Sequence, residues 1–377
     1  MNWKVPLFKI YWEEDDVESI AGVIRSGMNW ATGPKVEEFE QKVVDFTGVE
    51  HAVTFNSGTS ALHAAMIAYG IGPGDEVIVP SFTFIATANA PLFVGAKPVF
   101  ADVEEETYGL DPSDVAEKIT KKTKAIMPIH VGGCPCHIRE LAEIAEDRHI
   151  PLIEDAAESL GSKIGERKVG TFGDSAMFSF CGPKVITTGE GGVIVTGRKD
   201  LAEKLKLIRS HGRAETKDYF STNEYLDYVT LGYNWRFSNI LAALGITQLA
   251  KIDRIVGMRR QNSAYMTERL NREAPGVKTP SPPDGYYHLF QMYTIRTQGR
   301  DALMDHLSRK GVMAKVYFPP VHRTHFYRNV LHDRSLLPVT EKLAGDSLTL
   351  PMYPNLTTEE MDLMISEIGA FCGGAPA

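Results

Sequence analysis

Between about residue 35 and residue 200 the sequence alternates short apolar runs with amphipathic helical patterns, and this alternation limits the chain to few fold classes. Runs rich in β-branched and aromatic residues predict strands over 51–55, 76–80, 97–102, 125–130, 151–155, 176–180 and 193–196. Several of these runs are continuously apolar, which is typical of strands buried on both faces of a parallel sheet. The strand–helix–strand order therefore predicts an α/β domain with right-handed crossovers.

Helical patterns lie between these runs. Val36, Phe39, Val43 and Phe46 follow one another at spacings of three, four and three residues, which places them on one face of a helix. Residues 139–149 predict a further helix between two strands. Another helix opens at 111–112, with Asp as its N-cap and Pro at its first position.

The pattern changes after about residue 250. A helix-like stretch over 239–257 leads into the Pro-rich segment 279–285, and residues 357–360 (TTEE) form a capping box before a last amphipathic helix. We expect a large α/β domain over 1–255 and a small α+β domain over 256–377. The first ~30 residues are free to pack with the small domain.

Composition excludes several classes of protein. The chain has 377 residues and a formal charge of −8, so it carries no basic footprint for nucleic acid. It contains no apolar run of about 18 residues and its first residues do not resemble a signal peptide, so we expect no membrane span. Four cysteines indicate a reduced, cytoplasmic setting rather than a disulfide scaffold.

Common cofactor and catalytic motifs are missing. No G-x-G-x-x-G follows a strand, no H-E-x-x-H or G-x-S-x-G occurs, and 192–198 only approaches a phosphate-binding loop, with Arg where Lys is needed. The run Cys134-Pro135-Cys136-His137 is too tight for a metal site and has no second cluster, so we expect a packed loop and no metal.

Three segments together indicate one kind of site. At 56–68 (NSGTSALHAAMIA) a strand ends and an Ala-rich helix begins. The free N–H groups at the start of this helix, together with Gly58, Thr59 and Ser60, suit an anion. An ordinary N-cap is the alternative. The apolar run ending at Asp155 places carboxylates at the C-terminal edge of a strand, where α/β sheets bind ligands. For Glu154 and Glu158, capping of a following helix is an equally fair interpretation.

The third segment is 178–192 (FSFCGPKVITTGEGG), in which Lys184 follows an apolar strand beside a Gly-rich turn. A lone Lys is normally a solvated surface residue. In a partly desolvated site, however, a Lys is easily deprotonated and forms a Schiff base. Together the three segments predict a pyridoxal phosphate (PLP) site, which needs such a Lys, an acid for the ring nitrogen and an anion cradle.

These motifs, with 80–90 (PSFTFIATANA) and 232–249 (GYNWRFSNILAALGITQL), resemble the DegT/StrS family of PLP-dependent sugar aminotransferases. The likeness runs from about residue 5 to 370. It implies the aspartate-aminotransferase-like fold (fold type I), with a mostly parallel sheet, a smaller C-terminal α+β domain, and a homodimer whose sites lie between the subunits.

The resemblance also implies roles for individual residues. Lys184 matches the catalytic Lys, Asp155 the acid that pairs with the ring nitrogen, Phe84 the stacking aromatic, and Gly58, Thr59 and Ser179 the phosphate contacts. Glu158 stands near the ring hydroxyl, where many members have Gln or His, so a proton must be shared there. Asn234 resembles a residue that reaches the phosphate from the partner subunit. Tyr317 and His322 match a segment near the sugar, although a Pro-rich strand edge with a surface His is as good an interpretation.

The family likeness implies a ping-pong transamination from L-glutamate to a nucleotide-linked keto sugar, with a UDP- or GDP-linked 4-keto-6-deoxyhexose preferred. Because Lys184 is present, transamination is favoured over the dehydration that family members with His at this position perform. Cys181 departs from the His or aromatic of many members, which weakens any choice of sugar. A 3-keto sugar is the nearest alternative. A regulatory PLP-binding protein and a cysteine desulfurase are further ones; neither Cys181 nor Cys372 lies in a recognisable catalytic loop.

Overall fold

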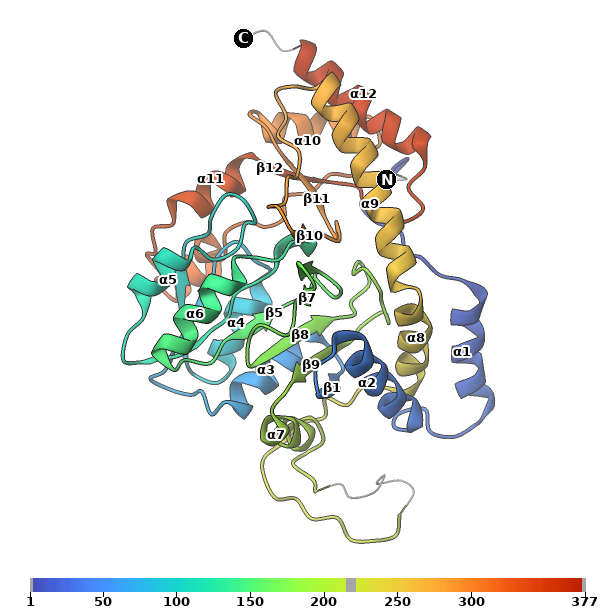
Figure 1. Ribbon diagram of the computed structural model, residues 1–377, viewed down its shortest axis with the longest axis vertical. Coiled ribbons are helices and arrows are strands. Elements are labelled where there is room, and N and C mark those ends of the chain that lie inside the picture. The colour runs from blue at the N-terminus through green and yellow to red at the C-terminus, as the bar shows by residue number, and fades with distance from the viewer. Residues whose placement is uncertain (1–2, 215–221, 375–377) are drawn as a thin grey trace.

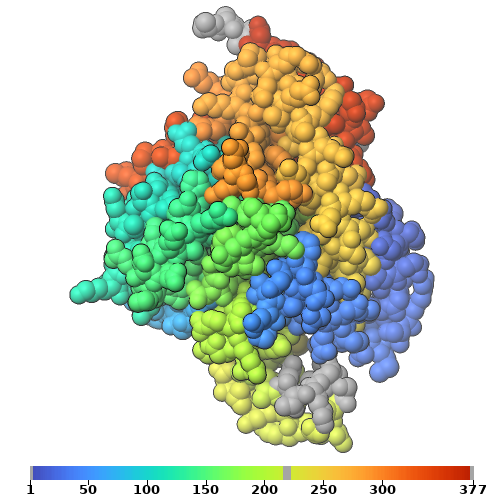
Figure 2. Space-filling view, in the orientation of Figure 1, coloured from blue at the N-terminus to red at the C-terminus, as the bar shows by residue number. Residues whose placement is uncertain are grey.

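The structure is a computed structural model and describes residues 3–214 and 222–374; residues 1–2, 215–221 and 375–377 lie outside it. A twisted sheet with helices on both faces forms the main body, and a smaller group of helices and strands from the C-terminal third packs at one end (Figure 1). Figure 2 shows this C-terminal third, in orange and red, seated on the body formed by the preceding residues.

The central sheet has two hydrogen-bonded parts, ordered β1-β9-β8-β5 and β3-β2-β4. Single parallel bridges, Ile126 to Leu152 and Ile129 to Asp155, join the two parts at β4 and β5. Their bounds are β1 (His51–Phe55), β2 (Glu76–Pro80), β3 (Lys97–Ala101), β4 (Thr123–Ile126), β5 (Ile153–Asp155), β8 (Ser175–Ser179) and β9 (Gly192–Thr196).

Most neighbouring strands in this sheet are parallel, whereas β9 runs antiparallel to both β1 and β8. A parallel pair needs a long crossover, but an antiparallel pair can be joined directly. The chain therefore returns from β8 to β9 through residues 180–191 without a helix, and this return carries Lys184 at the end of the sheet.

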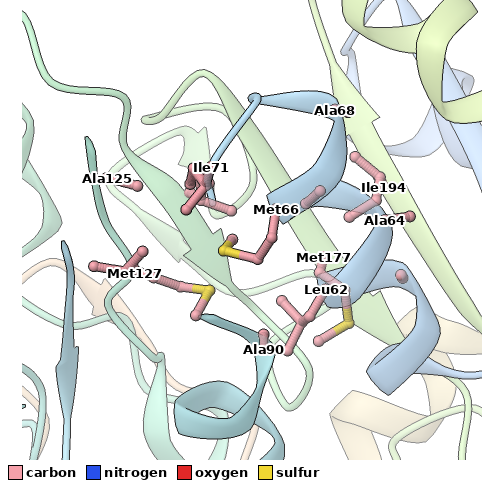
Figure 3. Close-up of a cluster of buried hydrophobic side chains, with 14 of the residues drawn as sticks. Leu62, Ala64, Met66, Ala68, Ile71, Ala90, Ala125, Met127, Met177 and Ile194 are labelled. Atoms are coloured by element: carbon pink, nitrogen blue, oxygen red, sulfur yellow. The ribbon is translucent and has the colours of Figure 1, made fainter. Parts of the chain in front are cut away.

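The strands are buried on both faces, as their apolar runs predict. In β8, Met177 packs with the cluster under α3 (Gly58–Ala68), whereas Ala176 and Phe178 pack with the cluster on the other face. Figure 3 shows the first cluster, in which Leu62 and Met66 of α3 lie against Met177 and Ile194 of the sheet.

Helices cover both faces of the sheet (Figure 1). One cluster joins the sheet to α3, α4 and α7, and another joins it to α2, α8 and the start of α9 (Ile252–Glu273). The helices of the body are α1 (Glu14–Arg25), α2 (Pro34–Thr47), α3 (Gly58–Ala68), α4 (Ile85–Phe93), α5 (Pro112–Lys118), α6 (Ile138–Arg148), α7 (Lys199–Arg209) and α8 (Asn239–Ala250).

The C-terminal third forms its own apolar cluster around the antiparallel pair β11 and β12. The capping box predicted before the last helix is present, since Thr357 and Glu360 exchange backbone-to-side-chain hydrogen bonds. The elements of this part are α9 (Ile252–Glu273), β11 (Tyr293–Arg296), α10 (Arg300–Arg309), α11 (Pro338–Asp346), β12 (Ser347–Leu350) and α12 (Thr358–Gly374). The proposed domain boundary at residue 255 falls inside α9.

Short elements connect the larger ones. The antiparallel strands β6 (Lys163–Ile164), β7 (Arg167–Lys168) and β10 (Tyr286–Tyr287) form a small sheet. Short 3₁₀ turns occupy 131–133 and 321–323, and a π-helical turn occupies 326–330.

The N-terminal residues contact both parts. Val5 belongs to the C-terminal apolar cluster and pairs with Val312 through a parallel bridge. In α1, by contrast, the Ser19 hydroxyl donates to the carbonyl of Ala243 in α8. The N-terminal segment thus ties the C-terminal part to the body.

Two predicted elements differ in extent. The strand expected over 125–130 ends at Ile126, and beyond it Ile129 pairs with Asp155 of β5 through a single parallel bridge. The helix expected over 239–257 is instead two helices that meet at Lys251. Lys251 is nearly buried and its ammonium lies 2.9 Å from Asp16, so a tertiary ion pair accompanies the break. Within the described residues, none of the helices is long and apolar enough to cross a membrane.

Candidate active site

A cavity of about 410 Å³ lies at the carboxyl ends of the strands, where α/β sheets bind ligands. β5 ends there at Asp155 and β8 at Ser179, while the segments that follow β1 and β2 supply further walls. Of the residues predicted for the site, those that line the cavity are Gly58, Thr59, Phe84, Asp155, Glu158, Ser179, Lys184 and Tyr317.

Asp155 is held at the floor of this cavity and is only 2% exposed. Its carboxylate accepts hydrogen bonds from the Thr87 hydroxyl at 2.7 Å and from the Ala157 amide at 3.2 Å. Burial raises the pKa of Asp155, whereas these two donors favour its charged form. A buried carboxylate of this kind suits a cationic partner supplied by a ligand.

Lys184 projects from the β8–β9 return, and its ammonium lies 3.3 Å from the carboxylate of Glu158. Glu158 is buried, and its second oxygen accepts a 2.8 Å hydrogen bond from the Gly132 amide. The Lys184 side chain keeps 17% of its surface exposed, so it is held by Glu158 and still accessible from the cavity.

The first turn of α3 lines the end of the cavity where the sequence predicts an anion site. Ser57 caps this helix by accepting a hydrogen bond from the Ser60 amide, which leaves earlier amides without an intrahelical partner. A Cβ atom at Gly58 would lie 3.1 Å from the sulfur of Met177 and 3.3 Å from Cβ of Ser179. Only glycine therefore fits without displacement. The hydroxyl-bearing Thr59 and Ser179 line the same end.

These features fit PLP. The α3 turn suits a phosphate, the buried Asp155 carboxylate suits a protonated ring nitrogen, and Lys184 supplies the amine for covalent attachment. Phe84 is 57% exposed at the cavity wall, so its ring has a free face for a cofactor ring. The residues present thus satisfy each requirement of this cofactor.

Two predicted residues lie elsewhere. Asn234 is exposed and does not line the cavity of this subunit. His322 is only 4% exposed and also lies outside the cavity lining. Its Nδ1 lies 2.7 Å from the Ser81 hydroxyl and its Nε2 lies 3.1 Å from Glu341, so both ring nitrogens already have partners within the protein.

Some site residues were not identified from the sequence. Thr87 bonds to Asp155 and in turn lies 2.7 Å from the Thr83 hydroxyl. Both threonines belong to the segment 80–90, in which only Phe84 was assigned a role. The Gly132 amide that holds Glu158 carries no sequence signal of its own.

The strand-end acids do not cap a helix. Glu154 accepts hydrogen bonds from the amides of Gly170, Phe172 and Gly173 and contacts the His130 ring at 3.0 Å, so it organises a loop that is distant in sequence. The His130 Nδ1 accepts from the Cys136 amide, which leaves its Nε2 to donate to Glu154. The helix-capping interpretation of Glu154 and Glu158 is therefore wrong.

The Cys134–His137 run forms a packed loop. Both thiols are buried, and burial raises the pKa of Cys134 and of Cys136. His137 instead contacts Glu106 at 3.4 Å. Across residues 3–214 and 222–374, no group of three or more His, Cys, Asp and Glu side chains is placed to hold a metal ion.

Comparison with known proteins identifies the family of this chain. The sequence pattern of the DegT/DnrJ/EryC1/StrS aminotransferase family matches residues 11–369. GDP-perosamine synthase of Caulobacter vibrioides is 38% identical over 343 residues, which are 90% of each chain. The pleiotropic regulatory protein of Geobacillus stearothermophilus is also 38% identical, over 353 residues that cover 93% of this chain and 92% of that one.

A solved structure shares the fold. DesV of S. venezuelae, crystallised in complex with a ketimine intermediate, superposes with a TM-score of 0.91 at 33% identity and covers 99% of both chains. The predicted fold type I architecture is thereby confirmed. The chain belongs to the DegT/DnrJ/EryC1/StrS aminotransferase family and is a PLP-dependent sugar transaminase.

Proposed function

We propose that the enzyme transfers the amino group of L-glutamate to a keto sugar linked to UDP or GDP, with a 4-keto-6-deoxyhexose as the preferred acceptor. The observation that carries this proposal is the convergence of Lys184, Glu158 and Asp155 on one cavity. The likeness to GDP-perosamine synthase favours a nucleotide-linked sugar as the acceptor.

Each of these side chains has a distinct task. PLP, when bound, withdraws electrons from the reacting carbon of the substrate. Asp155, as a buried carboxylate, keeps a proton on the ring nitrogen and so maintains that electron demand. The α3 turn with Thr59 and Ser179 holds the phosphate and fixes the orientation of the ring.

Lys184 moves the proton. Its amine is the group that can take a proton from the reacting carbon of the amino donor and return it at the neighbouring position. Glu158, 3.3 Å away, balances the charge on Lys184 whenever the amine is protonated. The overall exchange converts L-glutamate and the keto sugar into 2-oxoglutarate and the amino sugar.

The proposed assembly is a homodimer in which Asn234 of each subunit reaches the other subunit's phosphate site. Asn234 is exposed, and large apolar side chains near it are exposed too, with Tyr228 at 54% and Leu231 at 78%. The proposed setting is the cytoplasm, which fits the four unpaired cysteines. Sedimentation of wild type and of Asn234→Ala, with PLP content measured in both, tests this part.

Tyr317 lines the cavity, and we propose that it contacts the sugar. For His322, sugar contact remains a proposal that requires its ring to leave two partners inside the protein.

The test of the function is a product assay with ¹⁵N-labelled L-glutamate. UDP- and GDP-linked 4-keto-6-deoxyhexoses, and a UDP-linked 3-keto sugar, are offered separately, and the sugar product is analysed by mass spectrometry. The proposal expects the label to enter the 4-keto acceptor. Label entering only the 3-keto sugar would identify the alternative acceptor.

A second candidate, a PLP-binding regulator without turnover, is favoured by the equally high identity to the pleiotropic regulatory protein. Formation of 2-oxoglutarate from glutamate in amounts exceeding the enzyme would exclude it. PLP binding with no 2-oxoglutarate and no labelled sugar would support it.

A further inference from the structure

Lys315 lies at the wall of the active-site cavity and has no part in the chemistry assigned so far. The carboxylate and ammonium side chains lining this cavity are those of Asp155, Glu158, Glu190, Lys184 and Lys315. Lys184 is engaged by Glu158. Within the two described stretches of the chain, Lys315 forms no ion pair, so it is the one lining cation available to a ligand.

The position of Lys315 is fixed by its main chain. Its amide donates to the Thr349 carbonyl at 3.0 Å, and the Thr349 amide donates back to the Lys315 carbonyl at 2.8 Å. This exchange extends the β11–β12 pair by one antiparallel bridge. Thr349 lines the same cavity, so the backbone that presents Lys315 is part of its wall.

An aromatic ring orients the side chain. The Lys315 ammonium lies 4.7 Å from the centroid of Tyr317, within the range of a cation–π contact. Tyr317 also lines the cavity. The contact holds the ammonium near the cavity without a counter-charge that a substrate would have to displace.

The cavity needs such a group to accept a substrate anion in addition to the cofactor phosphate assigned to the α3 turn. Its carboxylates repel negative charge, and an anion that leaves water for a partly enclosed cavity requires a compensating cation. If the proposed function holds, both substrates are anions, since the amino donor carries carboxylates and the nucleotide sugar carries phosphates. We propose that Lys315 is the substrate-binding residue that pairs with this anionic group, a carboxylate of the donor or a phosphate of the nucleotide.

The test compares Lys315→Met with wild type, with Lys315→Arg as the charge-retaining variant. Lys310→Met is the control, because Lys310 lies in the same C-terminal part, outside the cavity, and pairs with Glu367. Two probes separate the sources of the anion. L-glutamate is titrated while the absorbance of the PLP-loaded enzyme is followed, and GDP and UDP binding is measured by calorimetry.

We expect Lys315→Met to weaken the binding of either L-glutamate or the nucleotides roughly 10- to 100-fold, as loss of a charge-assisted hydrogen bond does. Lys315→Arg should restore most of the lost affinity. Weakened glutamate titration identifies the donor carboxylate, and weakened GDP or UDP binding identifies the nucleotide phosphate. If Lys315→Met binds both L-glutamate and the nucleotides as tightly as wild type does, or if Lys310→Met shows the same loss of affinity, the inference is overturned.

The same two measurements on the wild-type enzyme test the proposed function separately. Failure of wild-type enzyme to respond to glutamate would remove the proposed donor, while GDP and UDP binding would still decide the role of Lys315. If wild type binds neither glutamate nor a nucleotide, both the function and the inference fall. Thermal unfolding of each variant checks that the exposed Lys315 can be replaced without loss of the fold.

Discussion

The carboxylate of Glu158 lies 3.3 Å from the ammonium of Lys184, and the Gly132 amide holds the other carboxylate oxygen at 2.8 Å. The segment between β4 and α6 thus fixes, through Glu158, the position of the charge beside the amine that we propose to react. This relationship gives Glu158 a specific task, because a group that exchanges a proton during turnover needs a partner that stabilises its charged form.

Replacing Glu158 by Gln keeps an acceptor for the Gly132 amide but removes the charge next to Lys184. We expect Glu158→Gln to slow the reaction with glutamate by about 10²-fold while PLP stays bound, measured by single-turnover absorbance. The control is Glu190→Gln, which removes a carboxylate from the same cavity at a residue that contacts Cys181 instead of Lys184. Equal losses in the two variants would contradict a specific role for Glu158.

Asp155→Asn separates catalysis from folding. Turnover should fall about 10³-fold, equivalent to ~4 kcal/mol of barrier, because a neutral amide does not hold the ring nitrogen protonated. Burial raises the pKa of Asp155, so the stability of the cofactor-free protein falls as the pH rises from the ordinary pKa of Asp to the raised one, and the loss is complete above it. Urea unfolding of the cofactor-free variant at pH 7 should therefore show unchanged or higher stability. A variant with near-normal turnover would refute this role.

His322→Ala distinguishes an internal anchor from a substrate contact. The ring bridges Ser81, next to β2, to Glu341 of α11. The pKa of Glu341 is lowered mainly by the hydrogen bond from Arg323, and the hydrogen bond from His322 lowers it further. As an anchor, His322 should contribute about 2–4 kcal/mol to the free energy of unfolding, because its loss leaves buried partners unpaired. A direct sugar contact would instead raise the KM for the nucleotide sugar and leave the urea midpoint in place.

His288 predicts a pH dependence of stability. Burial lowers the pKa of His288 to about 3, below its ordinary value of 6.5. Between these two values the unfolded chain binds a proton that the folded protein does not, so stability falls as the pH drops from about 6.5 towards 3. His288→Gln should reduce the slope of unfolding free energy by up to ~1.4 kcal/mol per pH unit in this window. The matched control replaces an exposed histidine, His325→Gln, and an equal change of slope in both variants would contradict the assignment to His288.

Much of the fold could be predicted because its signals are local. The strand predicted over 76–80 has the same limits in the structure, since an apolar run between polar residues marks both ends. The Asp111–Pro112 start of α5 is likewise confirmed, with the Asp111 side chain accepting from the Ser113 amide. Caps and apolar runs act within a few residues, so the sequence displays them directly.

Other features depend on residues that are distant in the chain. The break between α8 and α9 has no Pro or Gly, and it accompanies the ion pair of Lys251 with Asp16. Capping of a following helix was one interpretation of Glu154, yet this carboxylate accepts hydrogen bonds from the amides of residues 170, 172 and 173. Thr87 was missed because only the folded chain brings α4 beside the end of β5.

The most direct test of the proposed transamination at Lys184 is the absorbance spectrum of the PLP-loaded enzyme before and after addition of L-glutamate. We expect a visible band that requires Lys184, is absent from Lys184→Ala, and moves to the near ultraviolet with glutamate. A UDP- or GDP-linked keto sugar should then restore it. If the band forms equally in Lys184→Ala, or if neither glutamate nor any keto sugar changes it in wild type, the assignment of Lys184 and the proposed transamination would be contradicted.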